Sequence, residues 1–240
     1  MRLFCLILLA VLFFACGEKT PLFSQNQSEN LAEKPLSYQA QLVNISKERA
    51  LLTSQYQKNP QNRENLEKAR QIFIRSAYRD IIPFWYETQW DFYGTTETPK
   101  EGKIACGYFV TTVLRDAGLR VERARLAQQA SEKIIQSLTK EAYIKRFRRV
   151  KIEDFVEAIE KWGEGFYIVG LDFHVGFIVN DGEKVYFIHS SYAEPYQVIK
   201  ETAVDSKVLA GSNYRVVGKI SADNELLTKW LLQKNIPTKR

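Results

Sequence analysis

Cys106 stands where a loop containing glycine and lysine runs into a predicted helix. The helix begins at the cysteine and ends at Gly118, because apolar residues recur between them at helical spacing. These apolar residues are Phe109, Val110, Val113 and Leu114. The first turn of a helix has unpaired N–H groups and the positive end of the dipole, so a thiol there ionises more easily. We therefore expect Cys106 to be a nucleophile; the alternative is a buried, inert cysteine.

The two histidines of the chain, His174 and His189, lie in segments rich in Val, Ile and Phe that are typical of strands. Asp181-Gly182 between these segments is a hairpin signal. With these two residues at the centre of the turn, Asn180 pairs with Glu183, and His174 falls directly opposite His189. Facing Cβ atoms in such a ladder are about 4.5–5.5 Å apart. A turn shifted by one residue, to Asn180-Asp181, would put Phe187 opposite His174 and break this arrangement.

One cysteine and two adjacent imidazoles have the composition of a catalytic triad. His174, the first histidine after Cys106, would take the thiol proton. His189 would orient His174 through its other ring nitrogen, as the third member of the triad. No metal or cofactor is implied, because these residues without a carboxylate at ligand spacing make a poor zinc site.

The elements around these residues predict an α+β fold, because helices come first and an antiparallel meander follows. Helices are predicted at residues 42–58, 63–82, 124–138, 152–162 and 226–233, and strands at 166–171, 173–180, 184–190 and 214–220. Pro83 is expected to end the second helix, and Gly163 to cap the fourth.

The first residues resemble an export signal. Arg2 precedes an uncharged apolar run, which is too short to span a bilayer. Cys16 follows it as in a bacterial lipoprotein processing site, although Phe13 departs from the usual leucine; an ordinary secretory signal or an uncleaved anchor are the alternatives. We expect five segments: a cleaved signal peptide (1–15), a lipidated cysteine and flexible tether (16–40), a helical N-terminal segment (41–88), a catalytic domain (89–220) and a C-terminal helix (221–240).

Export and lipidation leave Cys106 without a partner. Cys5 belongs to the leader and Cys16 would carry lipid, so no intramolecular disulfide is available to Cys106. A lone thiol in an oxidising compartment is a candidate reactive group. The lipid would attach the chain to a membrane of the cell envelope.

The composition is that of a folded domain with a mildly basic surface. Hydrophobic residues make up 45% of the chain and the formal net charge is +6. No stripe of lysine and arginine with interleaved aromatics is present, so we expect no nucleic-acid partner. The densest basic segment, residues 145–149, is predicted to be a solvated stretch before a helix.

Three segments resemble the NlpC-type papain-like cell-wall cysteine peptidases. The sequence from His174 to Val179, followed by residues 187–190, is similar to the paired histidine strands of that family. The segment from Cys106 to Val110 resembles its nucleophile motif, and residues 92–95 its aromatic-glycine motif. The likeness covers residues 90 to 200, slightly under half of the chain.

The resemblance implies a small papain-like domain with N-terminal helices packed on an antiparallel sheet. It implies Cys106 as nucleophile, His174 as base and His189 as the third member, acting on amide bonds of peptidoglycan stem peptides. We expect a monomeric lipoprotein of the cell envelope, held at the outer membrane on its periplasmic or surface face. Candidate substrate-binding residues are Trp90, Tyr93, Tyr108 and Ser190.

The chain departs from the family around the nucleophile, where Ala105 and Gly107 replace an acidic and a hydroxyl residue that belong to substrate binding. No phenol cleanly replaces the expected oxyanion tyrosine, although Tyr93 or Tyr86 could reach. Two alternatives remain: an inactive cell-wall-binding or structural lipoprotein of the same fold, and a transglutaminase-like acyl transferase. The latter would need Asp172 or Asp181 as an acidic third member.

Overall fold

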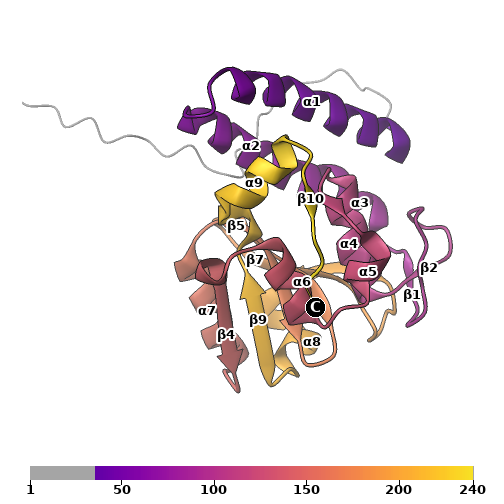
Figure 1. Ribbon diagram of the computed structural model, residues 1–240. Helices are drawn as coiled ribbons and strands as arrows, with labels where there is room; N and C mark the ends of the chain where they lie inside the picture. Colours follow the sequence, from indigo (N-terminus) through magenta and orange to yellow (C-terminus); the bar gives the residue numbers. More distant parts are fainter. Residues whose placement is uncertain (1–35, 240) are drawn as a thin grey trace, which may run out of the picture.

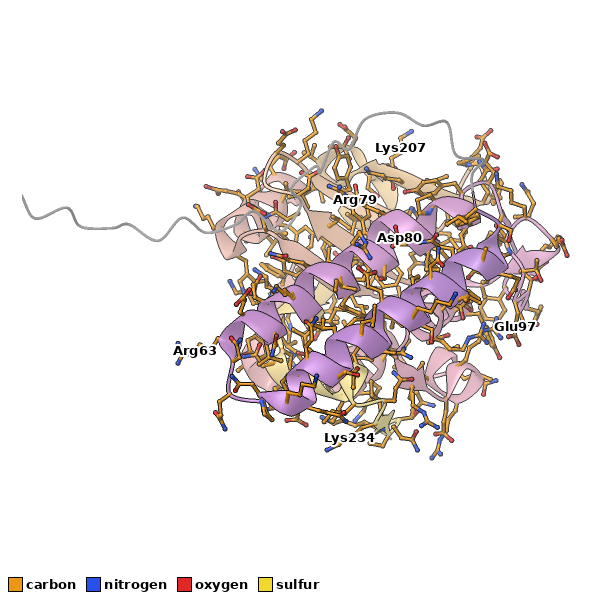
Figure 2. The ribbon with its side chains drawn as sticks, turned by 90° about the horizontal axis from the view of Figure 1, so that it is seen from above. Arg63, Arg79, Asp80, Glu97, Lys207 and Lys234 are labelled. Carbon is orange, nitrogen blue, oxygen red and sulfur yellow. The ribbon has the colours of Figure 1, made fainter. Side chains whose placement is uncertain are left out.

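The computed structural model describes residues 36–239. Two antiparallel helices, α1 (Tyr38–Lys58) and α2 (Arg63–Arg75), lie side by side across one end of the molecule (Figure 2). The side chain of Ser37 caps α1 by accepting a hydrogen bond from the N–H of Ala40, and Asn62 caps α2 in the same way. The first helix therefore begins inside the segment predicted to be a tether. The predicted signal peptide and Cys16 lie outside the described residues.

The second predicted helix continues past its expected end. After α2 the chain widens into a π-helix, η1 (Ser76–Ile81), and goes on into α3 (Ile82–Trp85). Pro83 lies in the first turn of α3, where a missing N–H breaks no helical hydrogen bond. The prediction that Pro83 ends the helical stretch is therefore wrong by a few residues.

A six-stranded antiparallel sheet forms the centre, with strand order β4-β9-β5-β6-β7-β8. Its strands are β4 (Ile144–Arg148), β5 (Gly165–Leu171), β6 (Val175–Asn180), β7 (Val185–Ser190), β8 (Val198–Thr202) and β9 (Tyr214–Gly218). Two short parallel pairs lie outside it: β1 (Gln89–Trp90) with β2 (Lys103–Ile104), and β3 (Arg120–Val121) with β10 (Asn235–Ile236).

The strand β4 was expected to be a solvated segment. It pairs with β9 alone and forms one edge of the sheet. Its basic side chains find partners on the surface: Lys145 lies over the ring of Trp162, and Arg146 forms ion pairs with Glu132 and Glu141. Charged side chains on an edge strand oppose pairing with another chain, which explains a strand with so basic a sequence.

Most of the remaining helices pack on the two faces of the sheet, and the others pack on neighbouring helices (Figure 1). They are α4 (Cys106–Asp116), α5 (Arg123–Ala127), α6 (Ser131–Leu138), α7 (Ile152–Trp162), α8 (Lys207–Ala210) and α9 (Asn224–Leu231), with 3-10 turns at Glu141–Tyr143, Ala203–Asp205 and Ile220–Ala222. The predicted helix over 124–138 is two helices, since the chain turns at residues 128–130. Gly163 caps α7 with a φ of 88°, as expected.

Two apolar layers hold the sheet. Phe177 of β6 points to one face, where it packs among residues of α2, α4 and α6; Phe187 of β7 points to the other, towards α7 and α8. The α+β class predicted from the sequence is confirmed. No helix among residues 36–239 is long and apolar enough to cross a bilayer.

The segments predicted as separate units share one core. Ile45 of α1, Phe109 of α4 and Trp230 of α9 are buried in the same cluster. The indole N–H of Trp230 also donates a hydrogen bond to the carbonyl oxygen of Ala117, at 2.7 Å. The N-terminal helices and the C-terminal helix therefore support the end of α4, the helix that carries the cysteine.

Candidate active site

A cleft of about 710 Å³ joins Cys106 and His174. Its walls come from five places in the chain: the loop after β1, the start of α4, the end of α5, the β5–β6 connection and the loop after β7. The lining residues are Trp90, Phe92, Tyr93, Thr95, Ala105, Cys106, Gly107, Tyr108, Ala127, Gln128, Phe173, His174 and Tyr192. The turn that divides α5 from α6 is what brings Ala127 and Gln128 to this wall.

Cys106 is the first residue of α4, as predicted. The N-cap, Ala105, has no side-chain hydrogen bond to the helix, so the first N–H groups remain available. The N–H groups of Val175, Gly107 and Cys106 itself face the sulfur and lower the pKa of the thiol, but burial acts in the opposite direction and is larger. The net pKa of Cys106 is raised above its ordinary value. The expectation that its helix position alone makes the thiol acidic is wrong.

The two histidines are in contact, but not in the register predicted. Nε2 of His174 lies 2.8 Å from Nδ1 of His189, and their rings meet edge to face. The hairpin pairs Asn180 with Val185, and the N–H of Asp181 donates to the carbonyl oxygen of Lys184. The turn is therefore centred on Gly182-Glu183 rather than on Asp181-Gly182, and His174 precedes the first strand. His189 therefore stands diagonal to His174. The register prediction is wrong by two residues, and the contact survives because a shift of two keeps both side chains on the same face of the sheet.

Gly176 opens the space for this diagonal contact. A Cβ atom at Gly176 would lie 2.6 Å from Cε2 of Phe187 and 2.9 Å from Cβ of His189. Phe187 stacks on the His189 ring at a centroid distance of 4.0 Å. Because Gly176 has no side chain, the rings of Phe187 and His189 can occupy the space that a Cβ atom would take.

Glu201 extends the hydrogen-bonded pair of histidines, and the sequence alone did not identify it. Its Oε1 atom lies 3.1 Å from Nε2 of His189 and accepts a second hydrogen bond, of 2.6 Å, from the hydroxyl of Ser206. Glu201 belongs to β8, which was not predicted as a strand. Val198 and Ile199 follow a loop and are β-branched, which is a strand signal. A strand that begins there and pairs with β7 places the Glu201 side chain on the same face of the sheet as His189.

The hydrogen bonds fix the direction of the proton chain. Burial raises the pKa of Glu201, but hydrogen bonds from His189 and Ser206 outweigh it, and the net pKa is lowered. Ionised Glu201 accepts only, so Nε2 of His189 donates to it. In a neutral ring Nδ1 of His189 then accepts from Nε2 of His174. The free lone pair of His174 is consequently at Nδ1.

Both partners of the thiol–imidazole pair are neutral at rest. His174 is 4% exposed, and burial together with the adjacent His189 lowers its pKa well below the ordinary value of 6.5. The ring is held from the sides by Tyr192 and Phe187, with ring centroids 5.0 and 6.2 Å away. A neutral imidazole in a fixed orientation can accept a proton over a wide pH range, but its lowered pKa also makes it a weaker base.

Three of the four predicted substrate-binding residues line the cleft: Trp90, Tyr93 and Tyr108. The fourth, Ser190, does not. It is completely buried and its hydroxyl donates to the carbonyl oxygen of Ile104 at 2.7 Å, which ties β7 to β2. The prediction for Ser190 is wrong, because the side chain after His189 points to the opposite face of the strand.

The other residues considered for catalysis lie in different settings. Asp172 accepts hydrogen bonds from Ser212 and from the N–H of Asn213, and Asp181 accepts from N–H groups within its own turn. Neither carboxylate contacts a histidine. Tyr86 packs against the main core, where burial raises its pKa, and does not line the cleft.

Gly107, one departure from the family motif, has a structural reason. A Cβ atom there would overlap the carbonyl oxygen of Ala127. The close approach of α5 to the start of α4 therefore requires glycine at this position, and it is this approach that forms one wall of the cleft.

A second cavity of about 690 Å³ lies between α1 and the β3–β10 pair. It has no cysteine or histidine in its lining, and its arginines have partners: Arg49 donates to the carbonyl oxygen of Gly118, and Arg115 pairs with Asp116. Across residues 36–239, no three His, Cys, Asp or Glu side chains are grouped to hold a metal ion. Of these two cavities, the first is the one whose lining contains both a cysteine and a histidine.

Comparison of the chain with models of protein families, with curated proteins and with solved structures gave no match. The function is therefore inferred from the geometry of the site itself.

Proposed function

We propose that the protein is a papain-like cysteine hydrolase that cleaves amide bonds in peptidoglycan stem peptides. One observation carries the proposal: the 2.8 Å contact between His174 and His189 leaves Nδ1 of His174 as the free nitrogen in a cleft that also contains Cys106. The class of substrate rests on the resemblance of the cysteine and histidine segments to the NlpC-type peptidases.

Acylation begins when the sulfur of Cys106 attacks the carbonyl carbon of the substrate and Nδ1 of His174 takes the thiol proton. Because both groups are neutral at rest, proton transfer accompanies the attack. The N–H of Cys106 at the start of α4 supplies a hydrogen bond to the oxyanion. The imidazolium then gives its proton to the leaving nitrogen, the C–N bond breaks, and a thioester remains on Cys106.

Deacylation uses the same base. A water molecule takes the place of the departed amine and loses a proton to Nδ1 of His174 as it attacks the thioester carbonyl. Collapse of this second intermediate breaks the C–S bond, and His174 returns the proton to the sulfur. The product is a carboxylic acid. Throughout, His189 positions His174, and Glu201 stabilises the positive charge that His174 and His189 share.

The proposal includes export as a monomeric lipoprotein of the cell envelope, attached through Cys16. Lipidation would hold the cleft close to its polymeric substrate. The expected result is that the full-length chain partitions into the detergent phase, whereas Cys16→Ala partitions into water. Equal partitioning of the two chains would contradict lipidation without affecting the proposed chemistry.

The direct test is digestion of purified peptidoglycan by the full-length protein and by Cys106→Ser. The proposal expects new peptide termini, identified by mass spectrometry, that appear only with the cysteine present. Release of no product by the wild-type protein, together with retained binding to peptidoglycan by both chains, would instead indicate the inactive wall-binding alternative.

A further inference from the structure

The cleft contains no permanently charged side chain. Apart from Cys106 and His174, its lining consists of aromatic, small and neutral polar residues, with no Asp, Glu, Lys or Arg among them. Three large apolar side chains at its mouth face water: Phe92 is 72% exposed, Tyr93 85% and Phe173 96%. Exposed apolar groups gathered at a cleft mark a surface that a ligand covers.

The charged residues nearest to the rim are already paired with other parts of the protein. Asp91 forms an ion pair with Lys103 at 3.3 Å. The guanidinium of Arg123 donates to the carbonyl oxygens of Thr95 and Thr96, at 2.9 and 2.8 Å. These groups brace the loop that forms one wall, so a charged ligand in the cleft would have to compete for them.

Polar recognition inside the cleft is available from neutral groups. Nε2 of Gln128 donates to the hydroxyl of Tyr108 at 3.2 Å, which leaves the other amide hydrogen, the amide oxygen and the phenol proton for a ligand. Amide and hydroxyl groups can pair with peptide groups but do not compensate an ionised carboxylate or ammonium group. Moving such an ion from water into this setting is costly.

We infer that the cleft selects neutral substrates, in which the groups that enter it beside the scissile amide carry no ionised carboxylate or ammonium. This inference rests on the proposed function and narrows it. Among stem peptides, those whose carboxyl groups are converted into carboxamides are the preferred substrates, and those with free carboxylates at the same positions are poor ones.

Two alkylating reagents test the cleft without any substrate. Iodoacetamide and iodoacetate both lose iodide to the sulfur and form the same C–S bond, but the second carries a carboxylate. Rates are measured at Cys106 of the full-length protein by mass spectrometry of the peptide, with 2-mercaptoethanol as the reference thiol. We expect the preference for iodoacetamide at Cys106 to exceed that of the reference by about tenfold, because the cleft offers the carboxylate no partner. An equal or reversed preference would overturn the inference.

A pair of charge insertions supplies the matched control. Gln128→Lys adds an ammonium group at the cleft wall, on an exposed side chain, and should narrow the gap between the two reagents. Gln129→Lys adds the same charge one residue further along, outside the lining, and should leave the gap unchanged. Equal effects of the two substitutions would show that overall charge, not the cleft, controls the preference.

Peptide pairs then separate this inference from the proposed function. With a stem peptide prepared as free carboxylate and as carboxamide, we expect kcat/KM to favour the carboxamide by about tenfold. Cleavage that depends on Cys106 but favours the carboxylate would overturn only the charge inference. Cleavage of neither peptide, with the alkylation preference intact, would overturn the proposed substrate and leave the neutral cleft standing.

Discussion

The Nε2 atom of His189 lies 3.1 Å from Oε1 of Glu201, on the side of the ring that faces away from His174. The imidazole of His189 is completely buried, whereas the carboxylate is only partly covered. In the proposed mechanism, Glu201 therefore acts on the thiol through the two histidine rings. It sets which nitrogen of each histidine carries a proton, and it does so without touching the cleft.

Replacement of Glu201 by glutamine should lower kcat by roughly 10–100-fold with little change in KM, because the neutral amide no longer requires His189 to donate. The acid limb of the kcat pH profile should also move to lower pH, because the carboxylate charge that stabilises the imidazolium is lost. Kinetics from pH 5 to 9 on Glu201→Gln and on Glu183→Gln, an exposed turn residue, provide the measurement. A kcat and pH profile equal to those of the control would exclude a positioning role for Glu201.

His189→Ala distinguishes the proposed triad from a transglutaminase-like site. It removes the acceptor of the His174 Nε2–H and should reduce kcat by about 10²–10⁴-fold, while Asp172→Asn, whose carboxylate is bonded to Ser212 and Asn213, should leave kcat nearly unchanged. His189→Gln keeps an acceptor and should recover part of the loss. A large loss in Asp172→Asn with an active His189→Ala would reverse the assignment.

The buried histidines make the protein less stable in acid. The unfolded chain binds a proton at His174 near the ordinary value of 6.5, while burial lowers the pKa of the folded state. Protonation therefore favours unfolding, and stability falls as the pH falls below about 6.5, by up to about 1.4 kcal/mol per pH unit and proton. His174→Gln should flatten this dependence. Denaturant unfolding at pH 7.5 and 5.5 measures it, and parallel curves for both chains would contradict the burial argument.

Glu201 adds a second loss of stability at lower pH. Its folded pKa is depressed, so its contribution is complete above the ordinary value of about 4.5 and disappears as the pH falls through the folded value. Glu201→Gln should lack this step. The histidine contribution keeps falling through the same range, so the Glu201 step is isolated by comparing the wild-type protein with Glu201→Gln between pH 5 and 3. A step that persists in the variant would assign it to another carboxylate.

Introducing the residues of the NlpC-type motif on either side of Cys106 should have opposite effects on stability at the two positions. Gly107→Ser places a Cβ atom against the carbonyl oxygen of Ala127 and should cost about 1–3 kcal/mol of folding free energy. Ala105→Asp places a carboxylate at an N-cap with extended backbone and should stabilise the protein by about 0.5–2 kcal/mol. Thermal unfolding of both variants checks the contrast. A higher melting temperature for Gly107→Ser than for the wild-type protein would show that α5 moves easily to accommodate the added side chain.

The sequence predicted those parts of the site that depend on local patterns. The start of the helix at Cys106 follows from apolar spacing, and the common face of the two histidines follows from strand alternation. The position of the turn was not predictable from Asp181-Gly182, because a glycine can also be the first of the two central residues, as Gly182 is here. The histidine pair was still found, since an even error in register preserves the face.

Features that depend on distant parts of the chain were not predicted. Glu201 can be recognised as a neighbour of His189 only once β8 is paired with β7. The basic segment β4 is a strand only because it pairs with β9, which lies far away in the sequence. The raised pKa of Cys106 reflects burial by side chains from several loops, whereas the sequence displays only the helix end. Such burial is a property of the assembled fold.

The burial of Cys106 has a consequence for its chemical lifetime. Peroxides and disulfides react with the thiolate, so a thiol that stays protonated is oxidised slowly. In the oxidising compartment that the proposed export implies, Cys106 has no second cysteine among residues 36–239 with which to exchange. In the proposed mechanism the sulfur of Cys106 becomes nucleophilic only when a substrate carbonyl reaches it and His174 takes the thiol proton. Between turnovers the sulfur would therefore remain a reduced thiol.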